Sequence, residues 1–161
     1  MKAVSWTRRK GLKGLLLVGI SGTLLNSQFA HAQRMNSGRL LSLEDMVQPI
    51  VKGAKLVKKE LQIEAPILAD NGSLVPIEIQ VQSPMSEQDH VTHIYLLSQR
   101  NPVTQMAMFQ FGPWNGFCGV STRIRLAGTQ EVVALARLSN GEFRYNQMEI
   151  IVTESSCVDA S

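Results

Sequence analysis

The 161-residue sequence predicts an all-β protein, an antiparallel β-sandwich preceded by a single α-helix. Two observations support this fold class. Short segments rich in β-branched and aromatic residues follow one another about every 8–12 residues, with turn-forming residues between them, as in sandwich proteins. Ahead of them, one segment carries apolar residues at helical spacing.

The helix is predicted over residues 43–59. Ser42, followed three residues later by Asp45, resembles a capping box at its start. Apolar residues then recur with roughly helical spacing, and Pro49 is compatible with a helix only near its beginning. Four lysines are expected on a solvated face, toward the C-terminal end of the helix dipole: Lys52, Lys55, Lys58 and Lys59.

The clearest strand covers residues 75–82, where apolar and polar side chains alternate as in a strand with one wet face. Asp70-Asn71-Gly72 is a turn signal before it, and Ser83-Pro84 interrupts the chain after it. Further strands are expected at residues 91–97, 106–111, 120–127, 131–138 and 143–152. The last of these leads directly into a short segment that holds Cys157.

Residues 1–32 are predicted to be a signal peptide. The start is basic, an apolar stretch runs to about Leu25, and Ala30-His31-Ala32 has small residues where a cleavage site needs them. Arg8-Arg9 resembles a twin-arginine signal, and a general secretory signal is the alternative. The apolar stretch is shorter than the roughly 18 residues of a membrane span, so no membrane anchoring is expected.

The basic charge of the chain resides in this signal. Five of the sixteen Lys and Arg lie in residues 1–32, which contain no Asp or Glu, so the remainder has eleven basic and thirteen acidic side chains, a formal charge of −2. A nucleic-acid-binding domain would need a basic stripe on the folded part, and none is expected. The remainder divides into a flexible N-terminus at 33–41, one domain at 42–154 and a cysteine-bearing arm at 155–161.

Several segments of the mature chain, in order, resemble the SoxY family, the sulfur-carrier subunit of periplasmic thiosulfate oxidation. Residues 67–76, Ile-Leu-Ala-Asp-Asn-Gly-Ser-Leu-Val-Pro, are similar to that family's I-A-E-N-G-x-x-V-P segment. Residues 120–126, Val-Ser-Thr-Arg-Ile-Arg-Leu, are close to identical with its V-S-T-R-I-R-L. The resemblance continues through Ser83-Pro84-Met85, Asn101-Pro102 and residues 138–141 to a cysteine close to the end of the sequence.

The resemblance implies an immunoglobulin-like β-sandwich with an N-terminal helix, and a periplasmic carrier that is not an enzyme and has no cofactor. It implies that Cys157 holds the sulfur intermediate covalently. The implied partners are a SoxZ-like subunit in a heterodimer, a haem-containing sulfur transferase, a sulfatase-like hydrolase and a sulfane dehydrogenase.

The tail differs from the family's Gly-Gly-Cys-Gly-Gly ending. Cys157 is flanked here by Ser155, Ser156, Val158 and Asp159, so the small residues are partly kept, Val158 is stiffer, and Asp159 adds negative charge. Three interpretations of Cys157 stay open: a working carrier of thiosulfate sulfur, a carrier for another (organic) sulfur substrate or other partners, or an inert or disulfide-locked cysteine in a decayed copy. A non-carrier β-sandwich binding module is the alternative for the whole domain.

The other candidate residues have competing interpretations. Cys118 is expected to be a buried structural thiol, with a Cys118–Cys157 disulfide as the alternative. His90 and His93 point to opposite faces of a strand, so no metal site is expected. Arg123 and Arg125 share an outward face and could contact a partner or an anion, or be simply solvated.

Two further pairs of residues have apolar side chains. Trp114 and Phe117 form either a contact patch or part of the core. Met106 and Met108 are expected to fill the core.

Overall fold

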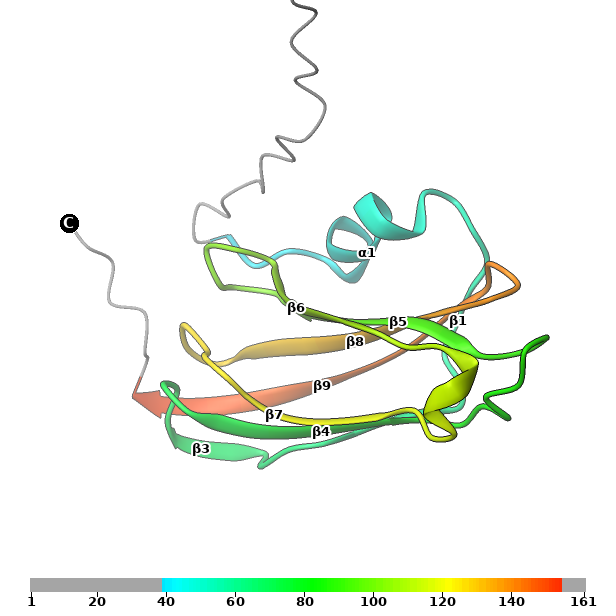
Figure 1. Cartoon of the computed structure of the whole chain (residues 1–161). Coiled ribbons are helices and arrows are strands. Elements are labelled where there is room, and N and C mark those ends of the chain that lie inside the picture. The colour runs from blue at the N-terminus through cyan, green and yellow to red at the C-terminus, as the bar shows by residue number, and fades with distance from the viewer. Residues whose placement is uncertain (1–38, 155–161) are drawn as a thin grey trace, which may run out of the picture. The chain divides into compact units, whose positions relative to one another are not determined.

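The computed structural model describes residues 39–154. Within that range the chain forms one α-helix, one short 3-10 helix and nine strands (Figure 1). In chain order they are α1 (Leu43–Val51), β1 (Leu56–Val57), β2 (Leu61–Glu64), β3 (Leu68–Asn71), β4 (Val75–Val81), β5 (Val91–Ser98), β6 (Gln105–Gln110), η1 (Pro113–Asn115), β7 (Gly119–Ile124), β8 (Gln130–Leu138) and β9 (Phe143–Glu154).

The strands form two sheets that pack face to face. The larger sheet has the order β1-β9-β8-β5-β6, with β3 also paired to β9, and the smaller sheet has the order β2-β4-β7. Figure 1 shows β4 and β7 below the larger sheet and α1 above it. The predicted all-β sandwich with an N-terminal helix is confirmed, and every strand predicted from residue 75 onward is present within one to three residues of its expected bounds.

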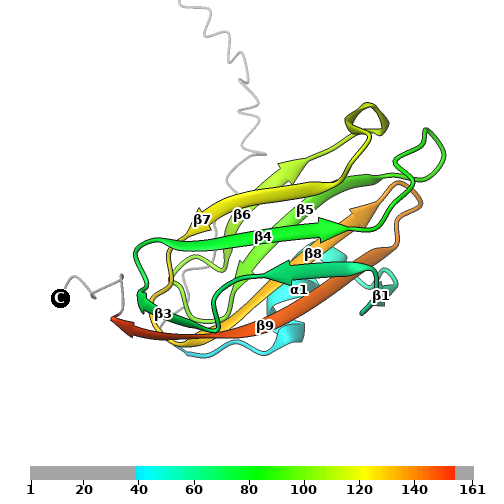
Figure 2. The same cartoon turned by 90° about the horizontal axis from the view of Figure 1, so that it is seen from below.

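Two pairings differ from a purely antiparallel arrangement. β1 and β3 both run parallel to β9, with Leu56 opposite Phe143 and Leu68 opposite Ile151. The chain changes sheets between β2, which pairs with β4, and β3 (Figure 2). Pro66 lies at this change, where a residue without an N–H cannot continue the ladder with β4. This crossing segment closes one side of the sandwich.

The helix is shorter than predicted. The capping box is present, since Asp45 N donates to Ser42 Oγ at 3.1 Å and Asp45 Oδ2 accepts from Ser42 N at 3.4 Å. However, α1 ends at Val51 because Lys52 adopts the left-handed conformation with φ of 51° and Gly53 follows with φ of 82°. Pro49 lies in the last turn rather than near the start.

The predicted lysine face of the helix is therefore wrong. Lys55 and Lys59 follow the helix and lie 3.2 and 3.8 Å from the carboxylate of Glu142. Arg144, which is 8% exposed, joins this cluster through a 2.7 Å ion pair with Glu60. These ion pairs connect the residues on either side of β1 with the start of β9.

The larger sheet is covered on both faces, because one core lies between the sheets and a second lies beneath α1. Met46, Val47 and Val51 of the helix pack on Leu135 and Phe143 of the sheet. This explains the unbroken apolar run of β8, since strands buried on both faces do not alternate. In the described part of the chain, no helix is long and apolar enough to cross a membrane.

Candidate functional site

The predicted attachment residue Cys157 and its neighbours Ser155, Ser156, Val158 and Asp159 lie outside the described residues. The structure describes the strand that carries them, up to Glu154 at the end of β9. The candidate site is therefore built from the last residues of β9 and the segments that hold them. We call these last residues, 151–154, the arm base.

On one side, the β3 segment holds the arm base. Ile151 N donates to Ile67 O at 2.8 Å, and Thr153 Oγ1 donates to Asp70 O at 2.6 Å. Gly72 N then donates to Glu154 O at 2.8 Å. Asp70-Asn71-Gly72, which the sequence predicts as a turn, thus also form hydrogen bonds with the final residues of β9.

Gly72 is required at its position by close packing. A Cβ on this residue would lie 2.4 Å from Leu126 O and 3.0 Å from Val152 Cγ1. Gly72 O also accepts from Leu126 N at 2.8 Å. The residue therefore joins the end of β9 to the chain just beyond β7, and a side chain would separate them.

On the other side, Thr129 holds the arm base. Its Oγ1 accepts from Val152 N at 3.0 Å and donates to Val152 O at 3.4 Å. The hydroxyl thereby supplies the hydrogen bonds that the backbone of a partner strand would make with Val152, one residue before β8 begins. Both edges of β9 are thus bonded at the arm base, and Cys157 follows Glu154 three positions later in the sequence. Three extended residues reach at most about 10 Å.

No local sequence pattern marks Gly72 or Thr129 as part of the site. The turn signal at residues 70–72 was visible, but its parallel pairing with a strand some 80 residues later was not. Thr129 has no local pattern that distinguishes it from any loop threonine, because its role depends on where β9 runs.

Arg123 and Arg125 are both exposed, as predicted for the outward face of β7. They line an open pocket of about 430 Å³ between the start of β6 and the end of β7, together with Asn101, Gln105 and Thr122. This pocket lies at the end of the sandwich where β9 finishes, because Leu126 and Glu154 both bond to Gly72.

Cys118 is a buried thiol, which confirms the main prediction for it. The residue is 1% exposed and belongs to the core between the sheets. Burial raises its pKa to about 12, so the thiolate is scarcely populated near neutral pH. Cys118 therefore lacks the nucleophilic form that covalent sulfur chemistry needs.

The aromatic residues at η1 are exposed rather than part of the core, with Trp114 83% and Phe117 61% accessible. Each ring lies over a glycine: Trp114 covers Gly112, and Phe117 covers Gly119. Met106 packs against the core as predicted, whereas the prediction for Met108 is wrong, since it is 52% exposed on the edge strand β6.

The histidines have separate surroundings. His90 Nδ1 lies 2.9 Å from Ser86 O. His93 stacks on Tyr95 with ring centroids 5.8 Å apart, and its pKa is lowered by burial and by the nearby charge of Arg137. Within residues 39–154, no group of three His, Cys, Asp or Glu side chains could hold a metal ion.

Comparison with known proteins agrees with this architecture. Residues 47–157 match the family model of the sulfur oxidation protein SoxY. The sulfur carrier protein SoxY from Chlorobium limicola f thiosulfatophilum has a similar structure, with a TM-score of 0.58 and 25% identity over 68% of this chain and 90% of that one. None of the curated proteins matches the chain.

Two reductases share the fold alone. A superoxide reductase (neelaredoxin) from Ignicoccus hospitalis has a TM-score of 0.52 and 19% identity, covering 58% of this chain and 80% of its own. A putative superoxide reductase from Thermotoga maritima has a TM-score of 0.50 and 21% identity, covering 65% and 90%.

The likeness to SoxY confirms the immunoglobulin-like sandwich that the resemblance implied. The family match covers most of the chain, from within α1 to Cys157. The chain therefore belongs to the SoxY family of sulfur oxidation proteins.

Proposed function

We propose that this protein is a sulfur carrier of thiosulfate oxidation, with Cys157 as the covalent attachment site. The observation that carries the proposal is the family match over residues 47–157, which ends on the cysteine that follows the arm base. A structural likeness to a protein described as a sulfur carrier supports it. Cys118 is a poor alternative, because it is buried with a pKa of about 12.

The proposed chemistry uses the thiolate of Cys157 as nucleophile. The thiolate joins the outer sulfur of thiosulfate, two electrons pass to a haem-containing sulfur transferase, and an S-thiosulfonate remains on the cysteine. A sulfatase-like hydrolase then adds water at the sulfonate sulfur, releases sulfate and leaves a persulfide. A sulfane dehydrogenase can oxidise that sulfane sulfur. The protein holds and presents the intermediate and is not itself an enzyme.

The arm base suits this role for a mechanical reason. Hydrogen bonds on both edges of β9 fix the chain up to Glu154, which gives the proposed carrier arm a fixed point of attachment. A thiol three residues farther on can extend at most about 10 Å from there. That distance allows the adduct to enter a partner's site while the sandwich stays outside.

Location and assembly are part of the proposal. Arg8-Arg9 and the apolar stretch after it support export to the periplasm, with the twin-arginine route as the expected one. We propose a SoxZ-like subunit as the stable partner in a heterodimer. No nucleic acid or membrane attachment is part of this role.

The experiment is replacement of Cys157 by Ser in a host that encodes no second carrier. The expected result is loss of thiosulfate oxidation, while Cys118→Ala leaves it intact, because only the first change removes the attachment atom and alanine keeps the buried position apolar. Unimpaired thiosulfate oxidation by the Cys157→Ser strain contradicts the proposal. If the Cys157→Ser strain still oxidises thiosulfate but no longer oxidises an organic sulfur compound, the carrier serves that other substrate. The replacement of the glycines in the tail makes this second candidate worth testing.

A further inference from the structure

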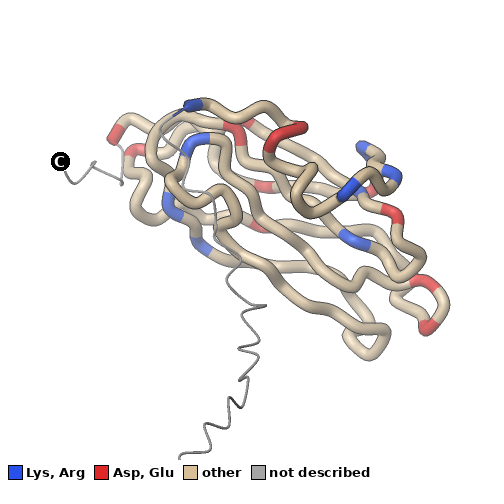
Figure 3. Tube along the Cα trace, turned by 90° about the horizontal axis from the view of Figure 1, so that it is seen from above, with Lys and Arg blue, Asp and Glu red and all other residues tan. Residues whose placement is uncertain are grey.

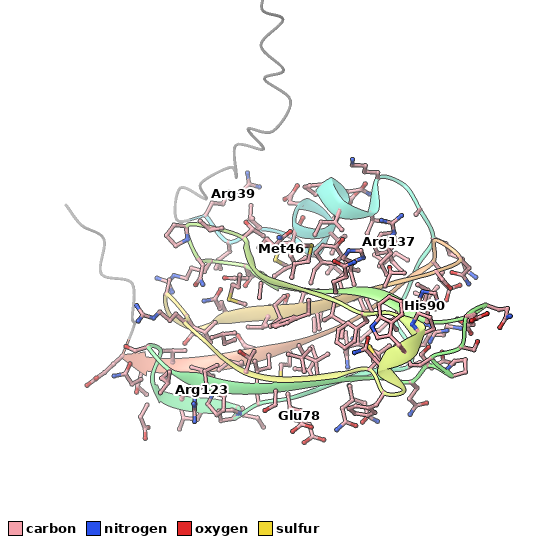
Figure 4. The ribbon with its side chains drawn as sticks, viewed as in Figure 1. Arg39, Met46, Glu78, His90, Arg123 and Arg137 are labelled. Carbon is pink, nitrogen blue, oxygen red and sulfur yellow. The ribbon has the colours of Figure 1, made fainter. Side chains whose placement is uncertain are left out.

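Exposed arginines gather at the end of the sandwich where β9 finishes. Arg100 follows β5, while Arg123 and Arg125 lie at the end of β7. Figure 3 shows a group of basic positions at this end, with acidic positions beside it and a second basic group at the opposite end. Figure 4 places Arg39 and Arg123 at this end, with His90 and Arg137 toward the other end. Two separate segments of the sequence thus bring their cations to one place.

A buried polar network fixes these segments to one another. Asn101 Nδ2 donates to Arg125 O at 2.8 Å, and Asn101 Oδ1 accepts from Ala127 N at 2.9 Å. Gln130, which is 2% exposed, accepts from Arg100 N at 2.9 Å and donates to Asn101 Oδ1 at 3.0 Å. The backbone that carries Arg100 and Arg125 is therefore held in place by buried hydrogen bonds, while the two side chains are exposed.

The arginine side chains have no acidic partner among the described residues. Within residues 39–154, the ion pairs involve Lys55, Lys59 and Arg144 with Glu60 and Glu142, which lie around β1 and the start of β9. The guanidinium of Arg100 lies over Gly128, where a Cβ would be 2.7 Å from Nη1. Asp70 of β3 and Glu154 of β9 are at this end, and neither forms an ion pair with these arginines among the described residues.

The pocket beside Arg123 and Arg125 has room and chemistry for a small oxyanion. Its volume is about 430 Å³, and much of its lining is apolar, from Pro102, Val103, Met106, Ala107 and Ile124. Hydrogen-bond donors for an anion come from the side chains of Arg123, Arg125, Gln105 and Thr122 at the same pocket. Guanidinium groups bind oxyanions through two parallel hydrogen bonds. The open pocket is accessible to an anion from solvent or from a nearby tether.

This cationic end is physically connected to the arm base. Arg100 packs on Gly128, the next residue, Thr129, bonds to Val152, and Leu126 is joined to Glu154 through Gly72. We infer that the end formed by Arg100, Arg123 and Arg125 binds the sulfonate group of thiosulfate or of the thiosulfonate on Cys157. The inference rests on the proposed function, since it assumes that Cys157 carries that adduct.

The first test follows backbone amides by NMR at low ionic strength. One arm titrates free thiosulfate into the reduced mature protein. The other uses protein treated with tetrathionate, in which the Cys157 thiolate displaces thiosulfate and keeps the S-thiosulfonate. We expect shifts at residues 100–101 and 122–128 in at least one arm, and the responding arm tells whether the free or the tethered sulfonate is bound.

Charge-removing variants make the test specific. In Arg123→Gln/Arg125→Gln the free-anion affinity, or the shift in the tethered arm, should fall about fivefold or more, while Arg123→Lys/Arg125→Lys retains part of it. Arg137→Gln is the matched control, because Arg137 is also an exposed strand arginine without an ion pair among the described residues. No shifts in either arm, or shifts that the double variant leaves unchanged, overturn the inference.

A second test measures how the cationic end acts on Cys157 itself. The rate of modification by dianionic tetrathionate is divided by the rate with neutral iodoacetamide, which cancels changes in thiolate population. We expect the ratio to fall at least about threefold in Arg123→Gln/Arg125→Gln and at high salt, and to stay constant in Arg137→Gln. If the ratio is unchanged in Arg123→Gln/Arg125→Gln, the arginines do not attract the anionic reagent to Cys157, and this part of the inference is wrong. Failure of either test does not contradict the proposed carrier role, because that role is tested separately by the mass of the adduct on Cys157.

Discussion

The amide nitrogen of Gly72 lies 2.8 Å from the carbonyl oxygen of Glu154, the last residue of β9. Gly72 precedes Glu154 by 82 residues in the sequence, yet its N–H forms the last described backbone hydrogen bond of β9 before Cys157. The proposed carrier therefore has a defined boundary between a rigid body and its working segment.

Gly72→Ala should destabilise the protein by about 3 kcal/mol, because the new Cβ would meet the Leu126 carbonyl oxygen at 2.4 Å and the backbone must shift. Urea unfolding followed by fluorescence measures the change. Ser73→Ala, one residue later, is the control and should alter stability by less than about 0.5 kcal/mol. Equal effects of the two changes would show that the close approach at Gly72 is not what matters.

Thr129→Val should loosen the arm base with little change of shape. The substitution removes the oxygen that accepts from Val152 N, leaving a half-buried amide without its partner, at a cost of about 1–3 kcal/mol. Hydrogen exchange of the Val152 amide should accelerate more than exchange in the centre of β8. Thr104→Val is the control, since the side chain of Thr104 makes no hydrogen bond among the described residues. A similar acceleration of Val152 amide exchange in Thr104→Val would count against the role of Thr129.

The two cysteines should differ sharply toward thiol reagents. At pH 8 the native, reduced protein should take up one iodoacetamide label, at Cys157, because Cys118 is buried and has a pKa of about 12. Labelling in denaturant should give two. Mass mapping of a native-state label to Cys118, or no labelling at all after reduction, contradicts this assignment of the thiols.

His93 should make stability depend on pH. Burial, and then the charge of Arg137, lower its pKa in the folded protein, so the unfolded chain binds the extra proton more readily. The stabilising effect is complete above the unfolded value of about 6.5 and is lost as pH falls below it. His93→Phe, which retains a ring to stack on Tyr95, should flatten the curve of unfolding free energy between pH 7.5 and 5; an unchanged curve excludes His93 as its source.

Local patterns were sufficient for most strands and for the start of the helix. Alternation identified β4, and the Ser42–Asp45 box set the first residue of α1. The end of α1 was missed because Ala54, Leu56 and Val57 continue an apolar spacing that β1 uses to pair with β9 instead. The left-handed conformation of Lys52 has no sequence signature comparable to a glycine at that position.

The site was less predictable because it depends on contacts between distant segments. Arg123 and Arg125 could be placed on an outward face by alternation, but Arg100 joins them only through the network of Asn101 and Gln130. Likewise, Gly72 reads locally as part of a turn, and its bond to Glu154 follows from the parallel pairing of β3 with β9.

The most direct test of the carrier role is the intact mass of the protein isolated, without reductant, from the periplasm of cells oxidising thiosulfate. The account predicts a mass increase equal to an S-linked thiosulfate or persulfide, mapped to the peptide of Cys157 and removed by a reductant. A thiol at Cys157 that is always unmodified, or an adduct that maps to Cys118, would contradict it.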